Sequence, residues 1–337
     1  MREQYARIAS LLRDRVRFAL ATLTATRNST PAPIGTSLIV LEGTDFVGNI
    51  GAGCHESEIF EAGHLTLIDG LHRSLEFDMR DDLLDGSSCG ASLSVAVWKP
   101  SLDFLPLADS IAIGNATVTI AVGETAITIP PKRRLIIAGA TELASRFASS
   151  ARSADFHVTI VDPRPAFATR RRQPDADDLV VAWPQEALPA LLGEADALVV
   201  MAHDVKLDLP ALRCALDSTI PYVGALGSMR SQRARRETLA DLGYDEDSLN
   251  RIYGPVGLDL GAVTNSQIAC AILAEILKVL NGRSGDSLRR RDDLGRSGGT
   301  PHYPSVSSVS CGDHPIRMPS YSDVSASFAS SRNGSIA

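Results

Sequence analysis

The chain has 337 residues, 44% hydrophobic and 22% charged, which is ordinary for a globular protein with room for two domain cores. The net charge is −7, and the basic runs at 170–172 and 289–291 are too brief and isolated to form a nucleic-acid-binding stripe, so we assign them to solvated surface. No apolar stretch is long enough to cross a bilayer, and five cysteines without a C-x-x-C pair fit reduced thiols. We therefore expect a cytoplasmic protein with neither a nucleic-acid nor a membrane partner.

Residues 1–100 alternate short β-like segments with helical ones, which predicts an α+β module. The first residues form an amphipathic pattern that runs into a strand. In the helical stretch near 54–69, apolar residues recur at intervals of three and four, so one face can pack on a sheet. The expected strands cover 17–26, 36–43, 45–50, 72–79 and 91–98.

The rest of the chain divides into three parts. Residues 101–132 are rich in Pro, Gly and Thr, and we expect a linker with a small hairpin. Over 133–281, apolar strands alternate with helices, which predicts a Rossmann-like, doubly wound parallel sheet that is buried on both faces. Residues 282–337 are rich in Ser and poor in apolar periodicity, so we expect a disordered tail.

Two cysteines of the first half lie in glycine-containing turns. Cys54 follows Gly51 and Gly53 in GNIGAGCHESE, and Cys89 precedes Gly90 in a second turn. The start of a helix lowers the pKa of a thiol, whereas nearby acids raise it. Two thiols could converge on a soft metal, although two are too few for a structural zinc site. From the residues alone, buried inert thiols are the simpler interpretation.

The turn LIIAGATELA occupies the position of a dinucleotide fingerprint, after a strand and before a helix. Asp162 ends the next strand, about where an acid would accept a ribose hydroxyl, and ligand binding and a structural turn are equally good explanations for it. The loop chemistry is poor, because Thr141 replaces the second glycine and Glu142 puts a negative charge at the helix start. We favour the interpretation that Glu142 stabilises the dipole of the following helix and that no phosphate binds.

Two further candidates follow later strands. His203 and Asp204 end a strand at the carboxyl edge of the expected sheet, where open α/β proteins build sites, but such a His is as often a turn residue. The segment 224–230 could form an anion-binding nest, or Ser228 could simply cap the next helix.

Taken together, nine motifs in order resemble the XdhC/CoxI family, the accessory factors for molybdenum hydroxylases such as xanthine dehydrogenase and carbon monoxide dehydrogenase. The resemblance covers about residues 17 to 281. The motifs are ALATLTAT, APIGTSLIVLEG, GNIGAGCHESE, SSCGASLSVAV, LIIAGATELA, VTIVDPRPAFA, VVMAHDVKLDLPAL, YVGALGSMRS and YGPVGLDLGAVTNSQIACAILAEIL.

The resemblance implies that the protein is a carrier without catalytic residues and not a metabolic enzyme. Such a carrier binds molybdenum cofactor, as molybdopterin or its dinucleotide form, supports its sulfuration with a cysteine desulfurase and delivers it to the apo-enzyme of a molybdenum hydroxylase. We also expect a homodimer. The implied cofactor-binding residues are Gly51, Gly53, Cys54, Glu56, Cys89, Gly90, Gly139, Asp162, His203, Asp204, Gly224, Gly227 and Ser228, with Cys54 and Cys89 at the metal.

The chain departs from the family pattern mainly in its second half. Residues 139–142 read Gly-Ala-Thr-Glu instead of Gly-Ala-Gly-His, and TNSQ at 264–267 replaces Thr-Pro followed by acids. The second-half site therefore binds a different ligand or is partly degenerate. The alternatives to a carrier are an NAD(P)-binding oxidoreductase, which Thr141 and Glu142 disfavour, and a cofactor-free docking paralogue.

Overall fold

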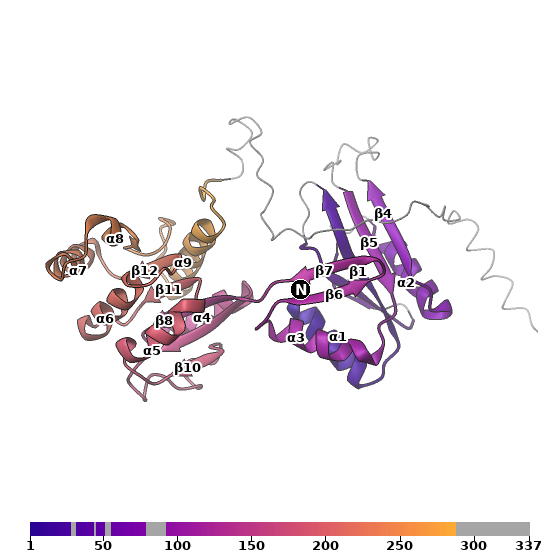
Figure 1. Cartoon of the computed structure of the whole chain (residues 1–337), viewed down its shortest axis with the longest axis horizontal. Coiled ribbons are helices and arrows are strands. Elements are labelled where there is room, and N and C mark those ends of the chain that lie inside the picture. Colours follow the sequence, from indigo (N-terminus) through magenta and orange to yellow (C-terminus); the bar gives the residue numbers. More distant parts are fainter. Residues whose placement is uncertain (28–31, 44, 51–54, 79–91, 288–337) are drawn as a thin grey trace, which may run out of the picture.

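The computed structural model describes residues 1–27, 32–43, 45–50, 55–78 and 92–287. In these residues the strands form a five-stranded sheet, a six-stranded sheet and a hairpin. The two larger sheets lie in separate halves of the molecule (Figure 1). None of the helices in this part of the chain has both the length and the apolar character that a bilayer crossing requires.

The first half is built on an antiparallel sheet in the order β3-β2-β1-β5-β4. Alternate residues of β1 point to opposite faces, so Leu20 joins one core cluster and Ala21 another. Helix α2 (Glu56–Asp69) covers the second face, where Gly63 lies so close to Val40 that a Cβ would sit 2.6 Å from it. The strands are β1 (Phe18–Arg27), β2 (Ser37–Leu41), β3 (Phe46–Val47), β4 (Arg73–Asp78) and β5 (Ser92–Trp98).

Residues 101–132 are more than a linker with a hairpin. The hairpin is present, as β6 (Val118–Val122) and β7 (Thr125–Ile129), but η1 (Leu102–Phe104) and α3 (Leu105–Ile113) precede it. Apolar residues alternate along both hairpin strands, and those facing inward are buried with α1 (Arg2–Arg13) and α3. Residues 101–132 are therefore part of the first core. Their Pro, Gly and Thr content predicts a linker because composition alone does not show which of their apolar residues are buried.

The second half confirms the predicted doubly wound sheet. Its strands are parallel, in the order β10-β9-β8-β11-β12-β13, which corresponds to 3-2-1-4-5-6 when they are numbered along the chain. The order reverses between β8 and β11, and this switch point is where such sheets place their ligands. The strands are β8 (Arg133–Ala138), β9 (Phe156–Val161), β10 (Asp178–Val180), β11 (Ala197–Val200), β12 (Tyr222–Ala225) and β13 (Ile252–Tyr253).

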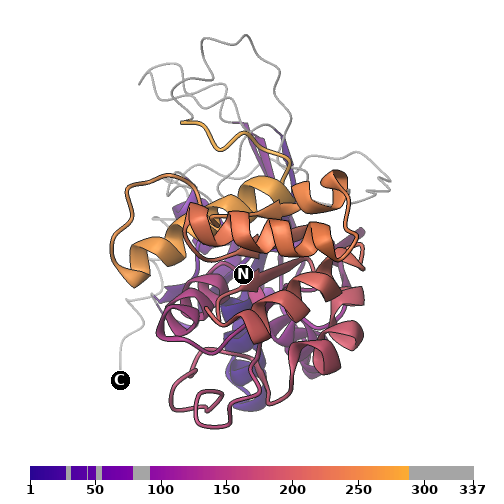
Figure 2. The same cartoon turned by 90° about the vertical axis from the view of Figure 1, so that its left-hand side faces the viewer.

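Helices cover both faces of this sheet. In Figure 2 the half of the molecule that contains the sheet faces the viewer. Helices α4 (Glu142–Ser153) and α9 (Asn265–Leu280) share one core cluster with Leu135 and Ile137 of β8. Ile136, from the same strand, faces the other cluster. On that second face lie α5 (Pro184–Leu191), η2 (Leu192–Glu194), α6 (Val205–Leu216), α7 (Met229–Asp241) and α8 (Glu246–Asn250).

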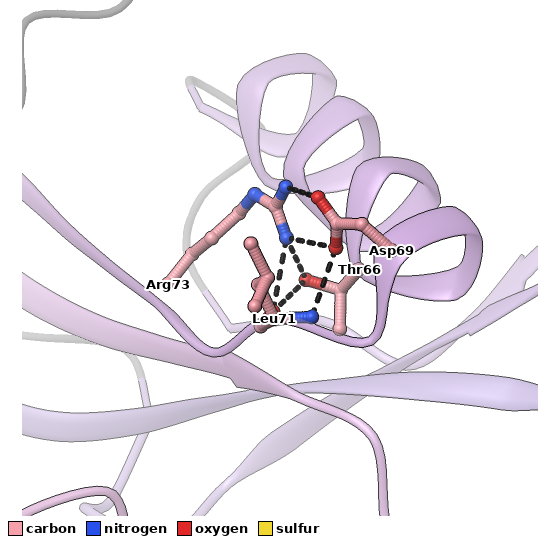
Figure 3. A network of polar contacts seen from close by, with 4 residues as sticks. All are labelled: Thr66, Asp69, Leu71 and Arg73. Atoms are coloured by element: carbon pink, nitrogen blue, oxygen red, sulfur yellow. Dashed lines mark hydrogen bonds and ion pairs between the residues drawn. The ribbon is translucent and has the colours of Figure 1, made fainter.

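A polar network fixes the turn from α2 into β4 (Figure 3). Arg73 pairs with Asp69 and donates through Nη1 to Thr66 Oγ1 at 2.9 Å, while the Leu71 N–H donates to Asp69 Oδ1 at 2.9 Å. The hydrogen bond from Arg73, helped by the one from Leu71, lowers the pKa of Asp69 to about 2. The network thereby sets the direction in which β4 leaves the helix.

The buried side chain of Arg2 makes a contact between the two halves. The Arg2 side chain donates to the carbonyl oxygens of Ile111 at 2.7 Å and Pro130 at 2.6 Å, both in the first half. Its Nε also donates to Asp155 Oδ2 at 2.9 Å, in the turn between α4 and β9. Arg2 is only 7% exposed, whereas the side chain of Asp155 is half exposed, so the contact between the halves lies at the surface edge of the arginine's buried site.

Candidate functional site

The carboxyl edge of the parallel sheet brings most of the second-half candidates together. Gly139 follows β8, Asp162 follows β9, His203 lies beyond β11 and Gly227 follows β12. Because parallel strands end at the same edge, the four loops surround the switch point. This edge is the candidate site of the second half.

Gly139 makes a close backbone crossing at this edge. Its φ is +113°, and a Cβ at this position would lie 2.6 Å from the backbone N and Cα of Ala202. Just beyond it, Thr141 Oγ1 accepts a hydrogen bond from the Ala144 N–H at 3.1 Å and caps α4. Glu142 lies in the first turn of α4, so the side chains after the glycine form an ordinary helix cap.

Asp162 is occupied by bonds within the protein. Its Oδ2 accepts from the Ala140 N–H at 2.8 Å and from Arg164 Nη2 at 2.6 Å, and its Oδ1 accepts from the N–H and Nε of Arg164, both at 2.9 Å. The side chain is fully buried. Burial opposes ionisation, but the bonds from Arg164 and Ala140 outweigh it and lower the pKa of Asp162. In this arrangement the carboxylate orders the glycine turn, and a ligand would have to displace one of these bonds to reach it.

His203 has an unusual backbone conformation. Its φ of +54° lies in the left-handed region, and its side chain is exposed at the carboxyl edge. The next residue, Asp204, caps α6 by accepting from the Lys206 N–H at 3.0 Å. The pKa of Arg164 is raised chiefly by its hydrogen bond to Asp162, and the charge of Asp204 adds to the effect. The loops after β9 and β11 therefore lie within electrostatic reach of each other.

The loop after β12 contains the remaining second-half candidates. Gly224 is a packing glycine inside the strand, because a Cβ there would lie 2.7 Å from Val256 Cγ2. Gly227 has a φ of +139°, and Ser228 caps α7 by accepting from the Ser231 N–H at 3.2 Å. The cap leaves the other N–H groups at the start of this helix directed toward the edge.

A buried ion pair that the sequence does not reveal holds this loop. Arg235 of α7 donates to the Leu226 carbonyl oxygen at 2.6 Å and also pairs with Asp208 of α6. Asp208 is only 1% exposed, and burial raises its pKa despite the opposing charge of Arg235. The partners are 27 residues apart in sequence. The only sequence signal is a lone acid in an otherwise apolar turn of α6.

Comparison with known protein families matches both halves of the chain. The family model described as the XdhC Rossmann domain matches residues 135–276, and the model for the XdhC and CoxI family matches residues 11–78.

The chain belongs to the XdhC/CoxI family.

Three curated relatives align with most of this XdhC/CoxI chain, but the aligned share of their own length differs. A probable subunit of xanthine dehydrogenase from Bacillus subtilis (strain 168) is 26% identical over 321 residues, covering 80% of this chain and 95% of the relative. The molybdenum cofactor insertion chaperone PaoD of Escherichia coli (strain K12) is 25% identical over 291 residues, covering 80% and 85%. The uncharacterized protein YqeB of the same strain is 26% identical, and this chain spans 47% of its length.

A solved structure has a similar overall fold. A crystal structure of a xanthine dehydrogenase from Bacillus halodurans superposes with a TM-score of 0.67, covering 84% of this chain and 98% of the other. Its sequence is 21% identical, so the comparison concerns the fold.

The first-half candidates of this XdhC/CoxI chain lie almost entirely outside the described residues. These are Gly51, Gly53, Cys54, Cys89 and Gly90. Glu56 is described and begins α2. Among the residues that the structure does describe, no three His, Cys, Asp or Glu side chains are grouped to hold a metal ion. The metal-binding role of the two thiols therefore stays a prediction.

Proposed function

We propose that this XdhC/CoxI protein binds molybdenum cofactor and assists its sulfuration and its insertion into a molybdenum hydroxylase of the xanthine dehydrogenase or carbon monoxide dehydrogenase type. The observation that carries the proposal is the relative named as a molybdenum cofactor insertion chaperone, which aligns over 80% of this chain and 85% of its own length. The partners that we propose are the apo-hydroxylase and a cysteine desulfurase, with the protein acting as a homodimer.

The donor groups of the chain suit the two ends of such a cofactor. When bound, the cofactor supplies a thiophilic molybdenum held by a dithiolene, whose oxo ligand is exchanged for sulfido. Cys54 and Cys89 would hold or shield the metal end, and the glycines beside them would allow backbone N–H groups to approach the pterin. At the carboxyl edge of the parallel sheet, His203 and the start of α7 at Ser228 would receive the phosphate or nucleotide end.

The alternative of an NAD(P)-dependent oxidoreductase has weaker support. Thr141 has a Cβ where a pyrophosphate-binding loop needs glycine, and its side chain caps α4. Asp162, at the position of a ribose-binding acid, is fully buried and bonded to Arg164 and Ala140. Both features argue against the usual mode of dinucleotide binding at this edge.

Cofactor retention tests the proposal. We expect the purified protein, mixed with molybdenum cofactor, to carry it through gel filtration, measured as molybdenum and pterin in the protein peak. Cys54→Ala should lower retention because it removes a soft ligand. Cys270→Ala is the matched control, since Cys270 is exposed on α9 of the other half. Equal retention by the wild type and by a variant lacking both Cys54 and Cys89 would remove the thiols from the proposal.

A further inference from the structure

The loop that leaves β9 carries an organised set of side chains that the proposed carrier role leaves unassigned. The sequence predicts that Arg170, Arg171 and Arg172 are surface residues in contact with solvent. In the structure their side chains make different contacts. Arg170 donates to the carbonyl oxygens of Ala176 and Asp177, so it ties the loop to itself. Arg172 is exposed but held against a ring.

Phe167 lies beneath two guanidinium groups. The Cζ of Arg164 lies 4.2 Å from the centroid of the Phe167 ring, and that of Arg172 lies 5.1 Å from it. Arg164 is also fixed by its bonds to Asp162. Within the described part of the chain, the guanidinium of Arg172 has neither an ion pair nor a hydrogen bond. Arg172 thus has a defined position and unused donors.

The neighbouring residue holds this arginine at the carboxyl edge. Gln173 is only 1% exposed, and its Nε2 donates to the carbonyl oxygen of Thr141 at 3.2 Å, directly before α4. The other atom of the same amide, Oε1, is buried and has no partner in the described residues. An unpartnered acceptor in a buried side chain costs free energy, and a ligand hydroxyl or amine could satisfy it.

The charge at this position is the reverse of that in an NAD-binding Rossmann fold. In such a fold an acid at the end of the second strand faces the ribose, whereas an arginine nearby accommodates a phosphate. Here Asp162 is buried and neutralised by Arg164, and Arg172 contributes an outward-facing positive charge to the loop. A guanidinium presents paired N–H donors that match two phosphate oxygens.

We infer that Arg172, held on Phe167, binds a phosphate group of the cargo at the loop that follows β9. The cargo's identity rests on the proposed function, whereas the phosphate chemistry does not. Two sources share this chemistry, namely the phosphate of the pterin itself and that of an attached nucleotide. Arg172 supplies the charge, the Phe167 ring holds its guanidinium in place, and the unpartnered Oε1 of Gln173 lies on the next residue of the same loop.

Titration calorimetry of the full chain with three probes tests the inference. The probes are adenosine 5′-monophosphate, adenosine and inorganic phosphate. Adenosine 5′-monophosphate should bind and adenosine should not, because the phosphate provides the attraction. If inorganic phosphate binds as tightly as the nucleotide, the pterin phosphate is the natural source. If it binds more weakly, the site also recognises a nucleoside. Equal binding of adenosine and its monophosphate would overturn the inference.

A pair of variants separates this site from general surface charge. Arg172→Met keeps an apolar chain on Phe167 and removes the donors, and should weaken binding of adenosine 5′-monophosphate about tenfold. Arg171→Met removes the adjacent exposed charge, which has no side-chain partner in the described residues, and should change affinity less than about twofold. Both variants should unfold at the temperature of the wild type. An equal loss of affinity for adenosine 5′-monophosphate in the two variants would refute a specific role for Arg172.

The outcome is independent of the carrier proposal. If no phosphate probe binds while the cofactor is still retained in gel filtration, the arginine site fails and the carrier function stands. If adenosine 5′-monophosphate binds through Arg172 while the cofactor is not retained, the carrier function fails and the phosphate site stands.

Discussion

His203 combines an exposed imidazole with a backbone conformation that favours glycine. A left-handed conformation costs an L-residue about 1–2 kcal/mol, and glycine avoids this cost. His203→Gly should therefore be more stable toward urea than His203→Ala by about 1 kcal/mol, although both variants lack the ring. Equal free energies of unfolding for the two variants would contradict backbone strain at this position.

Arg15 provides the matched control for this experiment. It has the same φ of +54°, is exposed, and follows α1 in the other half of the chain. Arg15→Gly and Arg15→Ala should show a similar difference in stability, since the backbone cause is the same. Loss of cofactor retention in the His203 pair, but not in the Arg15 pair, would assign the imidazole to ligand binding.

At the scale of elements, the crossing of the β8 turn over the end of β11 depends on Gly139. Any side chain there would collide with the backbone of Ala202 and would also require a φ of +113°. Gly139→Ala should lower the free energy of unfolding by about 2–5 kcal/mol, because overpacking and backbone strain add. Thermal and urea denaturation measure this loss.

Gly193 is the corresponding control. No atom lies within 4 Å of a Cβ built there, and its φ is not in the positive range. Gly193→Ala should leave the stability unchanged or raise it slightly, since alanine reduces the freedom of the unfolded chain. Similar losses for both alanine variants would show that the crossing at Gly139 is looser than its geometry indicates.

The sequence predicts the parallel sheet well, because strands buried on both faces form continuous apolar runs such as 135–138. It does not reveal α8 and β13, which are too short to show a period, or the helix α3 within a Pro-rich segment. The capping role of Ser228 follows from sequence position alone, whereas the cap by Thr141 is found only in the structure. The contacts of Arg235 and Arg172 cannot be predicted from sequence position, because tertiary packing determines their partners.

At the scale of the whole molecule, Arg2 joins the two halves. Replacing it with methionine would leave the carbonyl oxygens of Ile111 and Pro130 without their donor and Asp155 without its partner. Arg2→Met should lower the free energy of unfolding by about 2–4 kcal/mol and expose the connection at 130–133 to limited proteolysis.

Arg13 lies on the same helix and supplies the comparison. Its exposed ion pair with Asp109 joins α1 to α3 at 2.5 Å. Arg13→Met should cost less than about 1 kcal/mol, because water screens such a pair. If both methionine variants unfold alike, the buried contacts of Arg2 do not hold the halves together.

The packing of the hairpin is relevant to the division of the chain into domains. We propose four segments, with boundaries at 1–100, 101–132, 133–281 and 282–337. Because α3 and the hairpin share their core with α1, the second segment folds with the first. The expected tail lies outside the described residues from 288 onward.

The bonding of Asp162 has a consequence for acid tolerance. One carboxylate holds the Ala140 turn and Arg164 together, and its pKa in the folded protein is lowered from the ordinary 3.8. Its stabilising contribution is complete above that ordinary value and is lost as the pH falls through the lowered one. A single proton taken up in strong acid would thus loosen two loops of the carboxyl edge together, whereas milder acidification would leave them joined.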